Sequence, residues 1–401
     1  MMRGIKAFAA VAAALLTISG ASANDTKPLK IGVLTDMTGI LSSSLGAGSV
    51  DGARMAIEDF GKTVNGRPIE LIYADHQNKP DIGSAIARKW LDVEGVEAIM
   101  DIGNSAVGLA VRELVQSKDK IMIYSGASSG DLTGKFCSPN TAQWSQDSYM
   151  WAHALPTELV RQGKKKWFLI VQDWAFGHAL ESDVKKVVAQ NGGQIVESVR
   201  HPPGTMDFSS YLVRAQSSGA DTVAFLTAGQ DLSNMIKQAH EFGLAKTGQQ
   251  VVALAFLLAE AHGLGNQQAE GILFATVWYW NLDKRTREWS ERFFARNKVM
   301  PAEAHAAVYS STLHFLKAVK AAGTSDRAKV MEKMRELPVS DFYTDNVKLR
   351  EDGRLPRKAY IAQIKPPSAA KEPWDYYQIL SEISPETAWR PLSDKACPLL
   401  K

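Results

Sequence analysis

The chain has 401 residues, of which 45% are hydrophobic and 22% charged, and its formal net charge is +3. This length favours two domains, because single hydrophobic cores rarely grow beyond ~250–300 residues. The nearly neutral balance gives no electrostatic basis for binding nucleic acid or an acidic membrane surface.

The first 23 residues have the order of a secretory signal peptide. Arg3 and Lys6 form a basic start, residues 7–18 are almost wholly apolar, and residues 21–23 read Ala-Ser-Ala. A buried Ala-rich helix or an uncleaved anchor is the alternative, although the apolar run is too short to span a bilayer. We expect cleavage after Ala23 and a soluble, exported mature chain.

From residue 28 onward, short apolar strands alternate with helices in two successive units. In the first unit the apolar spacing predicts strands at 29–34, 69–74, 98–102 and 121–124, and helices at 51–60, 81–93 and 106–116. In the second it predicts strands at 167–171, 194–199, 222–226, 250–254 and 271–276, and helices at 150–162, 179–191, 211–217 and 232–242. The alternation predicts an α/β fold with two doubly wound parallel-sheet lobes.

The C-terminal part continues with a strongly helical segment, 286–322, which ends near Gly323 and is expected to pack on the first sheet. Strand-like pieces follow at 347–349, 360–364 and 376–383. No low-complexity linker separates the two units, which predicts lobes joined by several chain crossings.

The chain has two cysteines, Cys137 and Cys397, and each lies in a polar loop next to proline. In an oxidising compartment a distant pair favours a disulfide, with two free thiols as the alternative. A zinc site is not expected, because neither cysteine has His or acidic partners at short spacing.

Hydroxyl-rich loops follow three strands of the first unit, at 38–44, 103–106 and 124–130, and they are nearly free of charge. Open parallel sheets bind ligands at the carboxyl ends of their strands. Hydroxyls and exposed N–H groups at a helix N-terminus favour an anion such as a carboxylate. Ordinary N-capping explains each loop singly, but three loops at equivalent strand ends favour a carboxylate site.

The second unit carries aromatic residues at the corresponding places. Trp174 and Phe176 lie in the loop after its first strand, and residues 277–280 read Val-Trp-Tyr-Trp. Trp144 and Tyr149 lie near the first crossing. Core packing and ligand contact are equal alternatives for these residues. A hydroxyl-rich wall facing an aromatic-rich wall suits a small, flat or apolar acid.

Catalytic and metal motifs are scarce. Residues 46–48 read Gly-Ala-Gly after the first strand, but Asp51 stands where a dinucleotide fingerprint needs its third glycine. There is no P-loop and no H-E-x-x-H, and the eight histidines lack metal spacing. We therefore expect no catalytic residues, no cofactor and no bound metal.

Five stretches resemble the type I periplasmic binding proteins of the branched-chain amino acid (Leu/Ile/Val-binding) kind. They are residues 29–39, 51–56, 103–105, 173–177 and 211–226, and the similarity covers nearly all of 29–365. The resemblance implies the type I periplasmic binding fold, with two lobes joined by a three-crossing hinge. It also implies a monomeric periplasmic protein that hands a small molecule to an ABC transporter membrane permease.

On this basis we expect one lobe at 28–147 with 281–350 and the other at 148–280 with 351–385. A tail at 386–401 is tied back by the disulfide. By position, Ser105, the Ala106 amide and Ser129 resemble the family's carboxylate donors, and the Ala127 carbonyl falls where the family helps to hold an ammonium. The other expected ligand contacts are Ser44, Ser128, Trp174, Phe176, Gln230 and Phe256.

One departure bears on the ligand. Family members that bind amino acids carry an acid in a Gly-Pro-Glu-like turn, whereas residues 251–256 here contain none. A buried ammonium without a counter-charge is strongly disfavoured. The ligand expected is a benzoate, phenylpropanoid or aryl keto acid, as for a subgroup that resembles this chain at 279–283 and 397–399. Asp173 or Glu260 could supply the missing charge, so a branched-chain amino acid, amide or urea is the alternative. An enzyme and an extracellular sensor domain are the competing classes.

Overall fold

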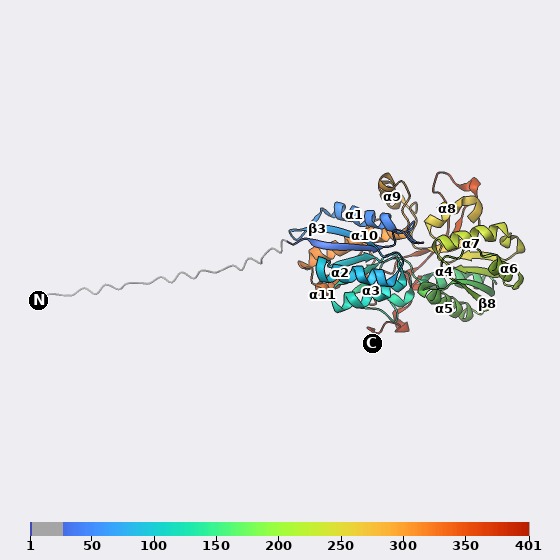
Figure 1. The fold of residues 1–401 in the computed structure, drawn as a ribbon, viewed down its shortest axis with the longest axis horizontal. Coiled ribbons are helices and arrows are strands. Elements are labelled where there is room, and N and C mark those ends of the chain that lie inside the picture. Colours follow the sequence, from blue (N-terminus) through green and yellow to red (C-terminus); the bar gives the residue numbers. More distant parts are fainter. Residues whose placement is uncertain (2–26, 401) are drawn as a thin grey trace.

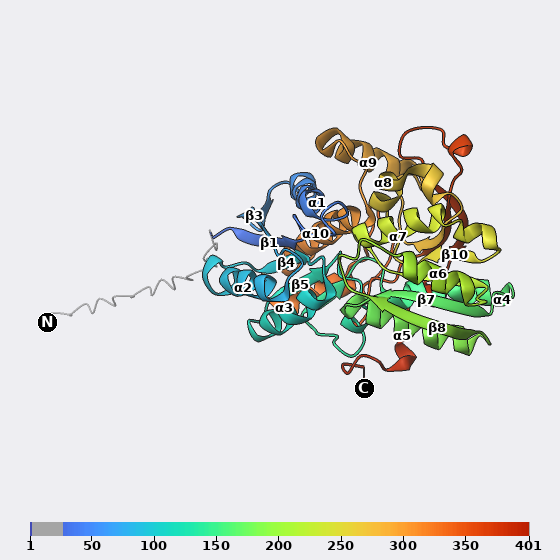
Figure 2. The same cartoon turned by 45° about the vertical axis from the view of Figure 1, so that its right-hand side comes forward.

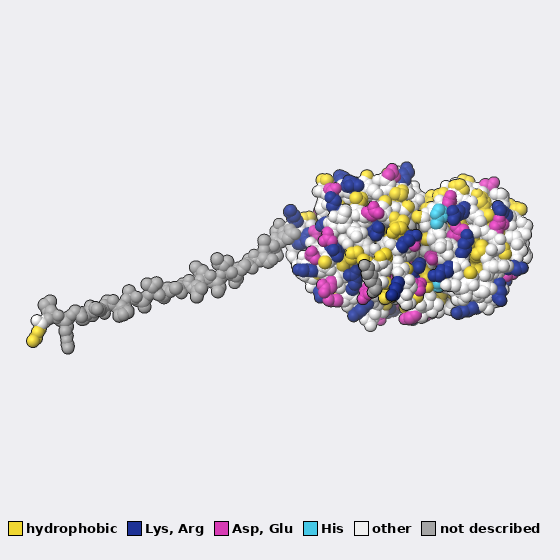
Figure 3. Space-filling view, turned by 90° about the horizontal axis from the view of Figure 1, so that it is seen from below, with side chains coloured by type: hydrophobic (Ala, Val, Ile, Leu, Met, Phe, Trp, Pro, Cys, Tyr) yellow, Lys and Arg dark blue, Asp and Glu magenta, His cyan; other side chains and the backbone are white. Residues whose placement is uncertain are grey.

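The computed structural model describes residue 1 and residues 27–400, which form two α/β lobes lying side by side (Figure 1). The predicted signal peptide and its cleavage site lie outside the described residues. No helix of the described part is long and apolar enough to cross a membrane. Lys, Arg, Asp and Glu side chains are intermixed over the face seen in Figure 3.

The first lobe is built on a six-stranded sheet with the order β2-β3-β1-β4-β5-β6, parallel except for the β2–β3 hairpin. Its strands are β1 (Leu29–Thr35), β2 (Thr63–Val64), β3 (Arg67–Asp75), β4 (Ala98–Asp101), β5 (Ile121–Tyr124) and β6 (Thr141–Gln143). Helix α1 (Gly46–Phe60) covers one face, and α2 (Pro80–Lys89) and α3 (Ser105–Ser117) cover the other (Figure 1). Successive residues of β1 therefore point to opposite faces of the sheet: Val33 packs in the hydrophobic cluster that includes α1, and Leu34 packs in the cluster that includes α3.

The second lobe is built on a seven-stranded sheet with the order β13-β12-β11-β10-β9-β7-β8. The parallel strands are β7 (Lys166–Gln172), β8 (Gln194–His201), β9 (Thr222–Leu226), β10 (Gln250–Ala253) and β11 (Leu273–Thr276). The antiparallel strands are β12 (Ala359–Ile364) and β13 (Tyr377–Ile383). The helices are α4 (Ser148–Arg161), α5 (Ala175–Gln190), α6 (Ser209–Ser217), α7 (Gly229–Glu241) and α8 (Leu258–Ala269), seen with the sheet in Figure 2. The two-lobed α/β prediction is confirmed.

The segment 286–322 is helical as expected, in two helices, α9 (Lys284–Asn297) and α10 (Glu303–Ala322), because Lys298 turns left-handed at φ 60° and Pro301 lies in the connection. One local expectation was wrong: residues 347–349 form no strand, since Val347 makes only an isolated bridge to Val339. Helix α10 lies against α1 on the first sheet, as expected, and α11 (Arg327–Glu336) packs on α10.

The chain passes between the lobes three times, at residues 144–147, 277–283 and 350–358. The first and third crossings lie side by side: the Gln143 N–H donates to the Gly353 carbonyl at 2.8 Å, and the Leu355 N–H donates to the Gln143 carbonyl at 3.1 Å. Gly353 has φ 84°, and a Cβ there would lie 2.6 Å from the Thr141 carbonyl oxygen. Only glycine fits this close approach.

A buried ion pair joins these two crossings. Arg354 and Asp147 are 1% and 3% exposed, and the Arg354 guanidinium donates to the Asp147 carboxylate. It also donates to the Ser145 carbonyl at 2.5 Å and lies over the Trp389 ring at 4.5 Å. The second Asp147 oxygen accepts from the Met150 N–H at 2.8 Å and so caps α4. One carboxylate therefore fixes both the hinge and the first helix of the second lobe.

The predicted disulfide is present. Cys137 and Cys397 are bonded with their Cα atoms 5.6 Å apart, across 260 residues of sequence. The chain reaches Cys397 from β13 along the second lobe, where the Trp389 indole donates to the Arg357 carbonyl at 2.5 Å. The tail thus leaves the second lobe and is fastened to the first.

We expect Asp147→Asn to lower the free energy of unfolding by about 3–5 kcal/mol, because it leaves the buried Arg354 cation without its counter-charge. Lys358→Met serves as the control, since it breaks the exposed Lys358–Glu382 pair and should cost less than about 1 kcal/mol. Urea unfolding of the mature chain measures both. Equal losses in the two variants would contradict the role given to the ion pair.

Candidate functional site

A cavity lies between the lobes, where the carboxyl ends of both sets of parallel strands face each other. The loops after β1, β4 and β5 form one wall, the loops after β7, β9 and β10 form the other, and Gln146 enters from the first crossing. The volume inside the cavity in which the centre of a water molecule fits is about 60 Å³. It is lined by Leu41, Ser44, Leu45, Gly103, Asn104, Ser105, Ser125, Gly126, Ser128, Gln146, Trp151, Trp174, Ala175, Phe176, Ala228, Ala255, Leu257 and Ala304. None of these described lining residues is ionisable.

The first-lobe wall is made of hydroxyls held by the N-terminus of α3. The Asn104 side-chain oxygen accepts from the N–H groups of Ala106 and Val107, at 2.7 and 3.1 Å. The Ser105 hydroxyl oxygen accepts from the Ser129 N–H at 3.1 Å, which leaves its proton free to be donated into the cavity. The Ser128 hydroxyl donates to the Gly126 carbonyl at 3.0 Å. A Cβ on Gly126 would lie 2.8 Å from the Leu45 side chain, so this wall needs glycine.

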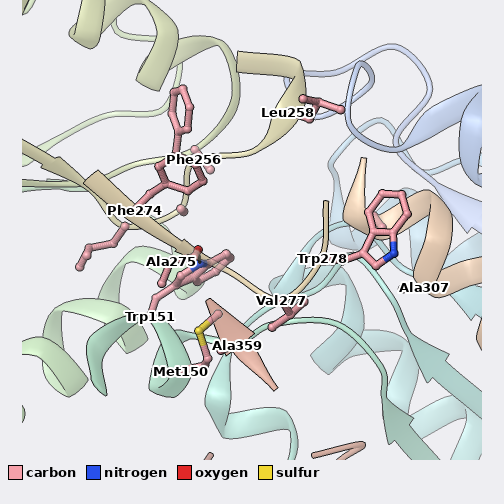
Figure 4. Close-up of a cluster of buried hydrophobic side chains, with 14 of the residues drawn as sticks. Met150, Trp151, Phe256, Leu258, Phe274, Ala275, Val277, Trp278, Ala307 and Ala359 are labelled. Atoms are coloured by element: carbon pink, nitrogen blue, oxygen red, sulfur yellow. Dashed lines mark hydrogen bonds between the residues drawn. The ribbon is translucent and has the colours of Figure 1, made fainter. Parts of the chain in front are cut away.

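The second-lobe wall is aromatic. Phe176 sits edge-on between Trp151 and Trp174, with ring centroids 5.5 and 6.1 Å away at interplanar angles of 75° and 80°. The Trp151 indole is fixed by donation to the Ala275 carbonyl at 3.0 Å, and Figure 4 shows the ring beside that strand. The Trp174 indole nitrogen is buried, and no described residue accepts from it.

The other aromatic residues singled out in the sequence pack the molecule instead. Trp144 is fully buried and donates to the Ser310 hydroxyl at 3.0 Å. Tyr279 and Trp280 both donate to the Trp374 carbonyl, at 2.7 and 3.0 Å. Trp278 packs edge-on against a neighbouring indole, 6.0 Å between centroids, and lies near α10 in Figure 4. Core and inter-lobe packing accounts for this group.

The structure brings half of the predicted ligand contacts together at the cavity: Ser44, Ser105, Ser128, Trp174 and Phe176. Ala106, Ala127 and Ser129 lie behind the wall. The Ala127 carbonyl accepts from the Gln143 amide at 3.0 Å, and the Ser129 hydroxyl accepts from the Asp131 N–H at 3.3 Å.

Phe256 and Gln230 lie away from the cavity. Phe256 is fully buried against Phe274, 5.1 Å between ring centroids, as Figure 4 shows. Gln230 is exposed on α7, and its amide donates to Asn234 at 3.1 Å.

Several lining residues were not anticipated from the sequence. Gln146 is the most distinctive, since it is 4% exposed and its side-chain oxygen is buried without a described partner. Its only sequence signal is its place in the first crossing. Trp151 lay inside a predicted helix, and Ala255 replaces the expected Phe256 on the wall.

Two buried carboxyls stand behind the second-lobe wall. Glu260 accepts from the N–H groups of Gly229 and Leu257, at 3.0 and 3.2 Å, and burial raises its pKa to about 7. Glu303 accepts from the Thr276 hydroxyl at 2.5 Å, and burial likewise raises its pKa to about 7. The other candidate counter-charge, Asp173, is half exposed and bonds to His178 at 2.6 Å. None of the three lines the cavity.

Comparison with known proteins decides the family. A family model described as "Periplasmic binding protein" matches residues 28–371. The chain belongs to this family. A periplasmic binding protein of Burkholderia mallei, solved by crystallography, is 41% identical, with a TM-score of 0.90 over 93% of this chain and 99% of that one. The Leu/Ile/Val-binding protein homolog 6 of Brucella abortus is 26% identical over 370 residues, 86% of this chain and 93% of its own length.

A more distant likeness is a solute-binding protein of an ABC transporter from R. palustris, crystallised with benzoate. It is 18% identical, with a TM-score of 0.79 over 90% of this chain and 98% of that one, and at this identity it shows the shared fold. The resemblance to the Leu/Ile/Val-binding kind is thus confirmed. This periplasmic binding protein is a ligand-binding component of an ABC transporter, with a small molecule and a permease as its partners, and its family does not consist of enzymes.

Glu260 gives the protein a specific pH dependence. The folded state holds this proton up to about pH 7, whereas the unfolded carboxyl releases it from about pH 4.5, so the free energy of unfolding falls as pH rises through this window. Glu260→Gln keeps an uncharged acceptor for one of the two N–H groups, which bond to different carboxyl oxygens, and the cost of losing the other bond is the same at every pH. We expect its unfolding free energy, relative to the parent protein, to rise by about 3 kcal/mol between pH 4 and pH 8.

Urea unfolding across this pH range measures the difference, and other titrating groups cancel in it. Glu270→Gln, at the exposed end of α8, is the control. A difference between parent and Glu260→Gln that does not change with pH would show that the pKa of Glu260 is the same in the folded and the unfolded protein.

Proposed function

We propose that this binding protein captures a small carboxylate with an uncharged, aromatic or otherwise apolar body. One observation carries the proposal: the described cavity lining combines hydroxyls on one wall with aromatic rings on the other and includes no ionisable side chain. A bound carboxylate requires hydrogen-bond donors, an aromatic ligand body packs well on aromatic side chains, and a bound ammonium requires an anionic side chain. The described lining supplies hydrogen-bond donors and aromatic side chains but no anionic side chain.

The carboxylate end of the ligand belongs at the first-lobe wall. Ser44 and Ser105 present hydroxyls there, whereas the Ser128 hydroxyl already donates to the Gly126 carbonyl. Ser105 also opens α3, whose N-terminus favours negative charge. The Ala106 N–H, which the family resemblance assigned to the ligand, is bonded to Asn104 in this structure. We therefore assign the carboxylate chiefly to the hydroxyls.

An α-ammonium has no anionic partner in this described lining. Desolvating a charge without pairing is costly, and the nearest candidate, Glu260, already accepts two backbone N–H groups. Its raised pKa favours the neutral acid, which attracts a cation weakly. This argues against α-amino acids as the preferred ligands.

The body of the ligand belongs against the aromatic corner of Trp151, Phe176 and Trp174. Edge-on rings of this kind contact a flat apolar group from two sides. The benzoate bound to the R. palustris protein of the same fold agrees with this choice of ligand class.

A branched-chain amino acid is the second candidate. The aliphatic side chains of Leu41, Leu45 and Leu257 also line the cavity and would suit an aliphatic ligand. The name of the Brucella abortus relative points the same way. This alternative requires an ionised Glu260 turned towards the cavity.

The remaining expectations are part of the proposal. The chain acts as a periplasmic monomer after cleavage behind Ala23. Its lobes comprise 28–147 with 281–350 and 148–280 with 351–385, and they close over the ligand.

We expect benzoate, 3-phenylpropionate or phenylpyruvate to raise the melting temperature of the mature protein. A ligand that binds only the folded state stabilises it by about 4 kcal/mol at a thousandfold excess over Kd. Leucine, valine and urea are the matched comparison, and differential scanning fluorimetry with calorimetry is the measurement. Stabilisation by leucine or valine and by none of the aromatic acids would overturn the ligand class.

We expect Ser105→Ala to weaken binding of the stabilising acid about ten- to a hundredfold, because a hydrogen bond to a charged group contributes about 1.5–3 kcal/mol. Ser117→Ala is the control: it lies at the exposed far end of the same helix, where its hydroxyl donates to the Leu114 carbonyl. Isothermal titration calorimetry reports both. Unchanged affinity in Ser105→Ala and in Ser44→Ala would contradict the carboxylate assignment.

A further inference from the structure

Two polar atoms in the cavity wall are buried with no hydrogen-bond partner among the described residues. One is the indole nitrogen of Trp174, and the other is the side-chain oxygen of Gln146. Buried polar groups are almost always paired, so each exception calls for an explanation. Both atoms belong to residues that line the same cavity, which points to a group that enters it.

Neighbouring polar side chains with a purely structural role have hydrogen-bond partners within the protein. Trp151 lines the same cavity, yet its indole donates to the Ala275 carbonyl at 3.0 Å. Gln172, buried nearby in β7, is paired at both ends: its amide donates to Asp231 at 2.8 Å and its oxygen accepts from the Ala228 N–H at 3.3 Å. Trp278 and Trp289 also have unpaired indoles, but neither lines the cavity.

The chemistry of the two atoms defines the missing partner. An indole N–H can only donate, so Trp174 needs an acceptor, whereas the Gln146 oxygen needs a donor. A hydroxyl group is both at once. Trp174 stands on the second-lobe wall and Gln146 on the hinge, whereas the serine hydroxyls stand on the first lobe. The partner therefore belongs to the part of the ligand remote from its carboxylate.

We propose that Gln146 and Trp174 are specificity-determining residues that select an aromatic carboxylate bearing a hydroxyl group on its ring. This inference rests on the proposed function and deepens it. A ligand without the hydroxyl leaves both wall atoms desolvated and unpaired, and a site built to bond a hydroxyl rejects the analogue that lacks it. Substituted and unsubstituted acids of the same skeleton are thereby distinguished.

Paired ligands test the proposal. Benzoate is compared with 3-hydroxybenzoate and 4-hydroxybenzoate, and 3-phenylpropionate with 3-(4-hydroxyphenyl)propionate, by isothermal titration calorimetry on the mature protein. At least one hydroxylated acid should bind about tenfold or more tightly than its parent acid, as two new hydrogen bonds imply.

Trp174→Phe and Gln146→Leu should each reduce the ratio of the affinities for the hydroxylated and the parent acid about three- to tenfold. Both substitutions remove the unpaired polar atom and leave a side chain of similar size in the wall. Trp151→Phe is the matched control, because its indole is already paired inside the protein, and it should keep the preference. Gln146→Met is the second variant if Gln146→Leu lowers the melting temperature.

The outcomes separate the inference from the function on which it rests. Tight binding of parent and hydroxylated acids with equal affinity would overturn the inference and leave the proposed function standing. The same holds if the preference is present but survives Trp174→Phe and both Gln146 variants. If no aromatic acid binds the parent protein, the proposed function falls and the inference falls with it.

Discussion

The two lobes hold their relative positions through one buried ion pair, Asp147–Arg354. The pair joins the first and third crossings, and its carboxylate also caps α4. Because both charges are almost fully withdrawn from water, their hydrogen bonds must be satisfied by fixed neighbours, which constrains the backbone around them. Gln146 lies immediately before Asp147, so the same constraint positions a residue of the cavity wall. The geometry of the hinge and the geometry of the cavity wall therefore depend on the same ion pair.

The cavity itself depends on keeping charge out of its lining. Two buried carboxyls next to the cavity have partners of their own, Glu260 in backbone N–H groups and Glu303 in the Thr276 hydroxyl. Burial favours the neutral form of both. The carboxylate of a ligand would thus meet hydroxyls and helix N-termini rather than a repelling anion.

Much of the fold was predictable because parallel strands buried on both faces are continuous apolar runs, of which β7 and β9 are examples. The hydroxyl wall followed from the rule that ligands gather at strand carboxyl ends. The incorrect or missing predictions of cavity-lining residues have local causes. Beyond β10 the chain turns at residues 254–255, and there Ala255 and Leu257 line the cavity whereas Phe256 is buried in the core. Gln146 belongs to neither a strand nor a helix, and no periodicity marks it. Buried unpaired atoms become visible only once the packing around them is known.

The Cys137–Cys397 bridge closes the tail into a loop that begins on the second lobe and ends on the first. It is a fourth connection between the lobes, made by a disulfide bond instead of a backbone crossing. Any movement of one lobe relative to the other would therefore be limited, while the bond is intact, by the length of the tail between β13 and Cys397.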